Sequence, residues 1–141
     1  MKVLLDTNVI VSAVTTRGLC ADVFRAVLSD HDLVICEKVL DEVQRILRSK
    51  FSVPAALVSE YIELLSHDTI KAEPVGVAAV SIKDSDDVEI IAAALAAGVQ
   101  ILVTGDAEMQ RVKRVQGMRV LSPRAFWEEL KGQRGDVPGG R

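Results

Sequence analysis

Short apolar runs alternate with segments of helical periodicity along this chain, and the alternation restricts the fold more than any other feature of the sequence. The apolar runs are typical of buried strands. Strands are expected at residues 2–6, 33–36, 100–104 and 119–121, with a short and ambiguous one near 69–72. Helices are expected at 8–14, 21–29, 37–49, 54–66, 86–97, 107–115 and 123–130. Strands that alternate with helices predict an α/β fold, in which a parallel sheet is covered on both faces.

The length of 141 residues suits a single domain with one core. We expect that domain to span residues 1–131, because residues 132–141 contain four glycines and a proline and are typical of a flexible tail. The longest apolar stretch, at 90–99, is about half the length of a membrane crossing. Cys20 and Cys36 are expected to be small buried thiols, kept reduced in the cytoplasm.

The charge of the chain excludes a broad electrostatic attraction to polyanions. Charged residues make up 26% of the sequence, and the net charge is only −3. No global positive field therefore favours a nucleic-acid partner. Any polyanion must be bound locally, through metal ions or a small basic patch.

Two acidic residues directly follow apolar strands. Asp6 closes the first predicted strand, and Asp106 follows the predicted strand at 100–104. In an open α/β sheet, ligands bind outside the carboxyl ends of the strands. Asp6 and Asp106 are therefore candidates for one shared site.

Helical periodicity selects two further acids. On the helix at 37–49, Glu42 lies on the border of the apolar stripe and can point inward, whereas Asp41 faces water. On the helix at 86–97, Asp87 shares the apolar face and Glu89 lies on the far side. Asp84 and Asp86 are explained more simply as residues that cap this helix, although either remains an alternative to Asp87.

Carboxylates that converge in one cleft repel one another unless a cation neutralises them. A site of carboxylates without His or Cys favours Mg²⁺ or Mn²⁺ over zinc. The two histidines, His31 and His67, lie at predicted helix ends away from the acids, and we expect ordinary surface roles for them.

Four segments together resemble the PIN-domain family. They are VLLDTNVIVS at 3–12, DEV at 41–43, DSDD at 84–87 and LVTGD at 102–106. The resemblance covers residues 2 to 127 approximately, and it is closest to PIN proteins regarded as toxins of bacterial and archaeal toxin–antitoxin pairs.

The resemblance implies a three-layer α/β/α sandwich around a mainly parallel sheet of four or five strands. It also implies an endoribonuclease that depends on Mg²⁺ or Mn²⁺ and cleaves RNA phosphodiester bonds. The family's catalytic, metal-binding acids correspond to Asp6, Glu42, Asp87 and Asp106. Asn8 and Thr104 correspond to polar residues that orient the carboxylates or a metal-bound water, and Glu108 is a further, water-mediated candidate.

Several basic residues are candidates for contact with RNA. Arg17 and Lys83 are the first choices, and a second basic group contains Arg111, Lys113 and Arg114. The resemblance also implies an antitoxin partner and a homodimer. Apolar helix residues were considered for the dimer interface, although burial in the chain's own core explains them as well: Val58, Ile62 and Leu65.

Two other functions are compatible with parts of the pattern. A phosphatase of the haloacid-dehalogenase type also begins with a strand that ends in aspartate, but its second aspartate is here Asn8. A PIN-like module that has lost activity and only binds RNA or protein is the other alternative. The presence of all four acids argues against this loss.

Overall fold

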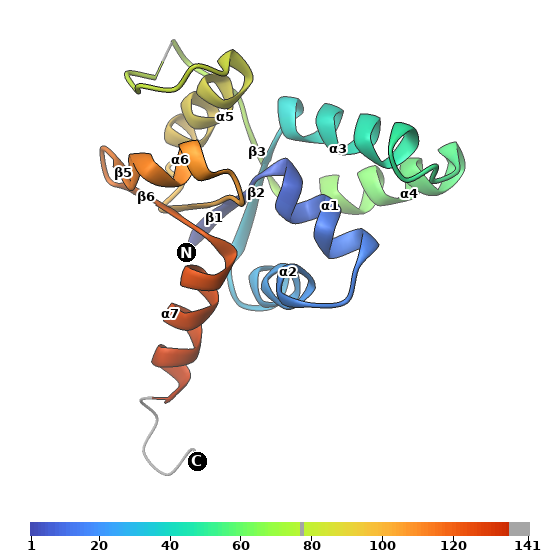
Figure 1. Cartoon of the computed structure of the whole chain (residues 1–141), viewed down its shortest axis with the longest axis horizontal. Coiled ribbons are helices and arrows are strands. Elements are labelled where there is room, and N and C mark those ends of the chain that lie inside the picture. The colour runs from blue at the N-terminus through green and yellow to red at the C-terminus, as the bar shows by residue number, and fades with distance from the viewer. Residues whose placement is uncertain (77, 136–141) are drawn as a thin grey trace.

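The structure is a computed structural model that describes residues 1–76 and 78–135 (Figure 1). Its strands are β1 (Lys2–Leu5), β2 (Asp32–Cys36), β3 (Ile70–Ala72), β4 (Ile101–Val103), β5 (Arg114–Val115) and β6 (Met118–Leu121). Its helices are α1 (Thr7–Thr15), α2 (Leu19–Asp30), α3 (Glu37–Ser49), α4 (Ala55–Ser66), α5 (Ser85–Ala96), α6 (Ala107–Val112) and α7 (Pro123–Gly135).

The strands form one sheet in the order β3-β2-β1-β4-β6-β5. All neighbours pair in parallel except β5 and β6, which are antiparallel. The central strand β1 pairs on both sides, so that Val3 lies opposite Leu33 of β2 and Ile101 of β4. Because helices cover both faces, apolar residues occupy successive positions of β1 and β4 and are buried.

Helices flank the sheet on two sides. In Figure 1, α1, α3 and α4 lie on one side of strands β2 and β3, and α5 lies on the other side with α6. Helix α7 packs against α2. This arrangement confirms the predicted α/β fold with helical layers on both faces of a mainly parallel sheet.

The sheet has six strands, whereas four or five were expected. The difference arises at residues 107–115, which were predicted to be one helix. Helix α6 ends at Val112, and the next residue, Lys113, leaves the helical conformation with a positive φ of 62°. Arg114 and Val115 then pair with β6 across a tight turn at Gln116 and Gly117. The apolar periodicity of Val112 and Val115 suits either structure, so the pattern alone did not reveal the break.

The ends of several elements differ slightly from the predictions. Strand β1 ends at Leu5, because Asp6 is already the N-cap of α1. Helix α7 continues to Gly135 and therefore includes the first residues of the predicted tail, while residues 136–141 lie outside the described part of the chain. The ambiguous segment near 69–72 contains β3, as predicted.

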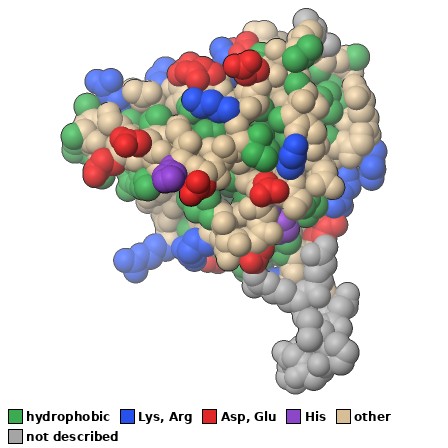
Figure 2. Space-filling model, turned by 180° about the vertical axis from the view of Figure 1, so that it is seen from behind, with side chains coloured by type: hydrophobic (Ala, Val, Ile, Leu, Met, Phe, Trp, Pro, Cys, Tyr) green, Lys and Arg blue, Asp and Glu red, His purple; other side chains and the backbone are tan. Residues whose placement is uncertain are grey.

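Burial of apolar residues decides between two alternatives that the sequence left open for α4. Val58 and Leu65 are buried in the core of this chain and Ile62 packs against that core, so these residues do not form an exposed interface. Cys20 and Cys36 are free thiols, half-buried and buried respectively. Within the described ranges, no helix is long and apolar enough to span a membrane. On the face shown in Figure 2, acidic, basic and apolar side chains are interspersed, in line with the small net charge.

Candidate metal centre at the carboxyl edge of the sheet

Asp6 and Asp106 follow two adjacent parallel strands, β1 and β4, and each begins a helix. The Asp6 backbone N–H donates to the Val103 carbonyl at 2.9 Å, which extends the strand pairing up to the acid. Asp6 Oδ1 accepts a hydrogen bond from the Thr7 N–H at 2.8 Å, and Asp106 Oδ1 accepts one from the Met109 N–H at 3.0 Å. Both carboxylates are therefore fixed as N-caps at the carboxyl edge of the sheet.

Thr104 connects these two acids. It is fully buried, and its Oγ1 donates to Asp6 Oδ2 at 2.7 Å and accepts from the Asp106 N–H at 3.0 Å. The Gln110 amide donates to the Thr104 carbonyl at 2.7 Å and holds the same turn from the side of α6. One hydroxyl thus sets the position of Asp6 relative to the loop that carries Asp106.

Asn8 holds the same loop from the side of α1. Its Oδ1 accepts a hydrogen bond from the Gly105 N–H at 3.0 Å. A Cβ atom at residue 105 would lie 3.2 Å from Asn8 Oδ1, a tighter contact than side chains usually make. The absence of a side chain at Gly105 therefore permits this close approach. Thr104 contacts Asp6 directly and Asn8 contacts the loop before Asp106, while the orienting roles expected for them stay predictions.

Glu42 approaches the centre from α3. It is half-buried, whereas its neighbour Asp41 is exposed, as the helical periodicity predicted. Glu42 Oε1 accepts a hydrogen bond from Thr7 Oγ1 at 2.6 Å. Thr7 follows Asp6 directly, so its side chain links the acid after β1 to the acid on α3.

Three neighbouring carboxylates, those of Asp84, Asp86 and Asp87, are candidates for the third acid of the site, and their contacts differ. Asp84 is the N-cap of α5 and accepts hydrogen bonds from the N–H groups of Asp86 and Asp87 at 2.8 and 3.4 Å. Asp86 forms an ion pair with Lys38 at 3.3 Å. Asp87 is half-buried and has no ion-pair partner among the described residues. Of the three, Asp87 is the carboxylate that lacks compensation, in agreement with its predicted inward direction.

The charges of the site act most strongly on Asp87. Burial, together with the negative charges of Asp6, Asp84, Asp106 and Glu42, raises the pKa of Asp87 to about 7. Burial also raises the pKa of Asp6 above its usual value, and it outweighs the hydrogen bonds from Thr104 and Thr7 that favour the charged form. Asp6, Glu42, Asp87 and Asp106 thus influence one another electrostatically, with Asp84 as a further contributor at Asp87.

The side chains of this group are of the type that binds hard cations, but they are not already arranged around a metal position. Its members are carboxylates, which suit Mg²⁺ or Mn²⁺, and none of the four pairs with a Lys, Arg or His in the part of the chain that the structure describes. In residues 1–76 and 78–135, no three His, Cys, Asp or Glu side chains are already arranged to hold a metal ion.

The histidines take no part in this group. His67 is exposed and lies 3.6 Å from the carboxylate of Asp68. His31 does not have the ordinary surface role that was predicted, because it is half-buried against Phe126 of α7 and its buried Nδ1 has no hydrogen-bond partner in residues 1–76 and 78–135.

The remaining predicted residues lie around the centre rather than in it. Glu108 is half-buried in the first turn of α6, next to Asp106. Lys83 is exposed immediately before Asp84. Arg17 is exposed beyond the C-terminal end of α1, about 15 Å along the helix from Asp6 by the rise per residue. Lys83 and Glu108 are thus close to the acids along the chain, whereas Arg17 follows the far end of α1.

Three residues of this region were not singled out from the sequence. Thr7 binds Glu42, Gln110 holds the Thr104 turn, and Lys38 pairs with both Asp86 at 3.3 Å and Glu89 at 4.0 Å. Position gave a signal for two of them: Thr7 is adjacent to Asp6, and Lys38 lies one helical turn before Glu42. Both side chains act across elements that are distant in sequence, which a local pattern does not reveal.

The fold and the acids after its central strands place the protein among α/β proteins with a polar site at the carboxyl edge of the sheet. Residues 2–108 match the family model described as PIN domain, and the chain belongs to the PIN-domain family. This confirms the resemblance found in the sequence and leaves no support for the haloacid-dehalogenase alternative. No curated protein matches the chain in sequence.

Two solved structures have a similar fold. The first, VapBC2 from Rickettsia felis bound to a DNA fragment from their promoter, contains a chain that is 14% identical with a TM-score of 0.60, and the match covers 86% of this chain and 98% of that one. The second, VapBC-1 from nontypeable Haemophilus influenzae, contains a chain that is 18% identical with a TM-score of 0.61, and the match covers 88% and 99%. At these identities the likeness concerns the fold.

Proposed function

We propose that this protein is a metal-dependent endoribonuclease that hydrolyses RNA phosphodiester bonds. The observation that carries the proposal is a group of four carboxylates at the carboxyl edge of the sheet, none of which has an ion-pair partner among the described residues. Burial, together with the neighbouring negative charges, raises the pKa of one of them, Asp87, to about 7. Partly buried carboxylates without partners lower the stability of the fold unless a bound cation neutralises them. The membership in the PIN-domain family supports the same conclusion, since these domains are generally metal-dependent nucleases.

Asp6, Glu42, Asp87 and Asp106 would hold Mg²⁺ or Mn²⁺. When bound, such a cation activates water for attack on a phosphodiester and neutralises the charge that develops on its oxygens. The surrounding residues set the direction of each carboxylate. Thr104 fixes Asp6 through Oδ2, and Thr7 fixes Glu42 through Oε1. Asn8 and Gly105 keep the loop of Asp106 against α1.

A cleavage assay with matched variants tests this proposal. Labelled RNA is incubated with the protein in Mg²⁺, in Mn²⁺ and in EDTA. We expect cleavage only with a metal, and a loss of about a hundredfold or more in Asp6→Asn, Glu42→Gln and Asp87→Asn, since even residues that only orient metal ligands cost 10- to 100-fold when lost. Asp41→Asn, which removes the exposed acid beside Glu42, retains full activity.

The alternatives correspond to other outcomes of the same assay. Cleavage that persists in Asp87→Asn would overturn the assignment of the site. A protein that binds RNA but never cleaves it, with either metal, would instead be a silent PIN-like binding module.

We further propose that the chain acts as the toxin of a toxin–antitoxin pair, in the cytoplasm. The support is the likeness of its fold to chains of two VapBC structures over nearly their whole length. We expect expression of the wild type to arrest growth of a bacterial host and Asp6→Asn to permit growth. Coexpression of a small protein encoded next to this gene should relieve the arrest. Failure of the neighbour to relieve it, or arrest by Asp6→Asn as well, would contradict the toxin role.

A further inference from the structure

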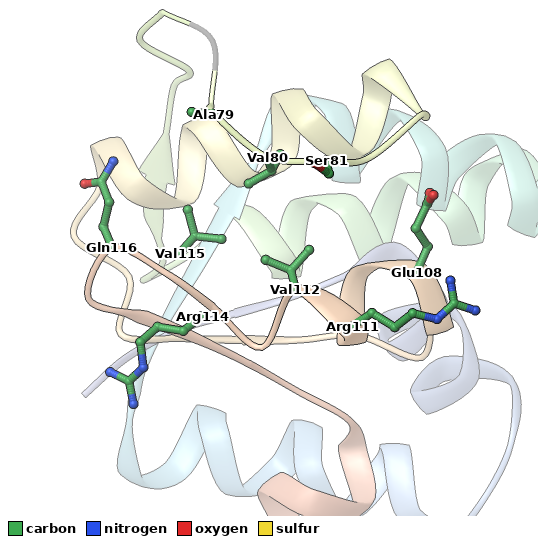
Figure 3. Close-up of a pocket in the computed structure, with 9 residues that line it drawn as sticks. All are labelled: Ala79, Val80, Ser81, Glu108, Arg111, Val112, Arg114, Val115 and Gln116. Atoms are coloured by element: carbon green, nitrogen blue, oxygen red, sulfur yellow. The ribbon is translucent and has the colours of Figure 1, made fainter.

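A slot with a volume of about 570 Å³ lies beside the metal centre, between the loop at residues 79–81 and the segment formed by α6 and β5 (Figure 3). This volume falls within the range of roughly 300–1,000 Å³ that is common for ligand pockets. Its lining consists of Ala79, Val80, Ser81, Glu108, Arg111, Val112, Arg114, Val115 and Gln116.

The two long walls of the slot are apolar. In Figure 3, Val112 and Val115 point from α6 and β5 toward the loop, where Val80 lies opposite them. Val80 and Val112 are only partly buried, so part of each side chain faces the slot. Apolar walls on opposite sides favour a flat, apolar group between them, because contact with both faces removes its surface from water.

The ends of the slot are polar, and one of them carries an arginine. Glu108 and Arg111 lie together at one end and Gln116 at the other, while the Arg114 guanidinium points away from the loop (Figure 3). In the described part of the chain, neither Arg111 nor Arg114 forms an ion pair. Arg111, which lies at one end of the slot without an ion pair among the described residues, is therefore the group that would attract an anion there.

Both walls of the slot are connected along the chain to residues of the proposed catalytic centre. Helix α6, which carries Glu108 and Arg111, is capped by Asp106. The loop that carries Val80 and Ser81 leads within three residues to Asp84, the cap of α5, which carries Asp87. Along α6, Arg111 lies about 7.5 Å beyond Asp106 by the rise per residue.

We propose that this slot binds one nucleotide of the RNA strand, next to the phosphodiester that is cleaved. The base lies between Val80 and the Val112–Val115 wall, and its phosphate contacts Arg111. Ser81 and Gln116 supply hydrogen-bonding groups for the edge of the base, as in other proteins that read single-stranded RNA. The inference rests on the proposed ribonuclease function, because it assigns the slot to the same substrate.

Titration with mononucleotides tests the slot without catalysis. The ¹⁵N-labelled protein is titrated in EDTA with each of the four ribonucleoside 5′-monophosphates, with ribose 5-phosphate and with inorganic phosphate. We expect nucleotides to shift the amide signals of residues 79–81 and 111–116, and ribose 5-phosphate and phosphate to bind at least fivefold more weakly, since they lack the base. Equal binding of all these ligands would overturn the base site, as would shifts confined to other regions.

Charge reversal at two arginines distinguishes binding in the slot from a general effect of charge on RNA binding. Arg111→Glu is compared with Arg124→Glu, which makes the same change at an exposed position on α7. We expect Arg111→Glu to weaken nucleotide binding and raise the KM for RNA about tenfold, the size of one hydrogen bond to a charged group. The kcat changes less than twofold, and Arg124→Glu changes neither quantity appreciably. Equal effects of the two substitutions would contradict the proposal.

The two proposals fail separately. If nucleotides bind in the slot and the protein never cleaves RNA, the ribonuclease function is wrong and with it the assignment of the slot to a substrate strand. If RNA is cleaved while the mononucleotides leave residues 79–81 and 111–116 unaffected, the slot inference alone is wrong.

Discussion

The two halves of the acidic centre differ in how their carboxylates are held. On the strand side, Asp6 and Asp106 are N-caps, and Thr104 joins them through short hydrogen bonds. On the helix side, Glu42 has one hydrogen bond from Thr7, and Asp87 has no ion-pair partner among the described residues. The strand side is therefore arranged by the protein itself, whereas the helix side depends on what neutralises its charge.

This difference suggests a division of roles within the centre. A preorganised pair reduces the cost of arranging ligands when a cation arrives. Acids on two separate helices can then move toward the cation without disturbing the sheet. We expect substitutions on the strand side to affect stability and activity together, and substitutions on the helix side to separate the two.

The largest effect is expected on the strand side, from Thr104→Val. The substitution preserves shape but removes the hydroxyl that binds Asp6 and Asp106. The buried carboxylate of Asp6 loses a partner, which costs about 1–3 kcal/mol of folding stability, and activity falls roughly 10- to 100-fold. Urea denaturation and RNA cleavage measure the two effects. Thr104→Ser keeps the hydroxyl and should restore most of both, and a failure to do so would argue against the bridge.

Metal addition tests the helix side directly. Mg²⁺ or Mn²⁺ should raise the melting temperature of the wild type, and at a hundredfold excess over the dissociation constant the gain is about 2.7 kcal/mol. EDTA should reverse the gain. Glu42→Gln should lose most of it and Asp41→Asn none of it. An equal response of these two variants would mean that the metal binds elsewhere.

Removal of the Asp87 charge should stabilise the metal-free protein. The pKa of Asp87 is raised to about 7, so the folded state binds this proton more tightly than the unfolded chain does. The contribution of Asp87 to stability is therefore present below about pH 4 and is lost as the pH rises to 7. In EDTA, Asp87→Asn should be more stable than the wild type by about 1–2 kcal/mol at pH 8, with no gain at pH 4. Denaturation at both pH values checks the sign.

The smallest effect is expected from Lys38→Met. Lys38 on α3 pairs with Asp86 and Glu89 on α5, and it holds together the helices that carry Glu42 and Asp87. Because these pairs are at the surface, we expect activity to fall only about two- to fivefold at low salt. Lys38→Arg should retain activity, and high salt should reduce the difference between Lys38→Met and the wild type. A loss as large as that of Thr104→Val would show a direct role for Lys38.

The sequence predicted best those features that depend on local periodicity. The inward direction of Glu42 and Asp87 follows from the helical period, and the position of Asp6 and Asp106 follows from the ends of apolar strands. Each of these inferences needs only a few neighbouring residues. The parallel order of the strands follows from the helices between them, since such crossovers place consecutive strands in the same direction.

Features that depend on contacts between distant segments were not predicted. The Thr7–Glu42 hydrogen bond and the Lys38 ion pairs join residues far apart in sequence. The break at Lys113 depends on pairing of β5 with β6, which outweighs the helical preference of the segment. The partial burial of His31 results from its contact with Phe126, which arrives with the last helix.

Both edges of the sheet are formed by very short strands. Strand β3 has three residues at one edge, and β5 has two residues at the other, where it runs antiparallel to its neighbour. Long exposed edges invite other chains to add strands and aggregate, and short edge strands are a common protection against this. A chain built in this way has little backbone on which a second copy could extend the sheet. Self-association of this protein would therefore be expected through its helical layers.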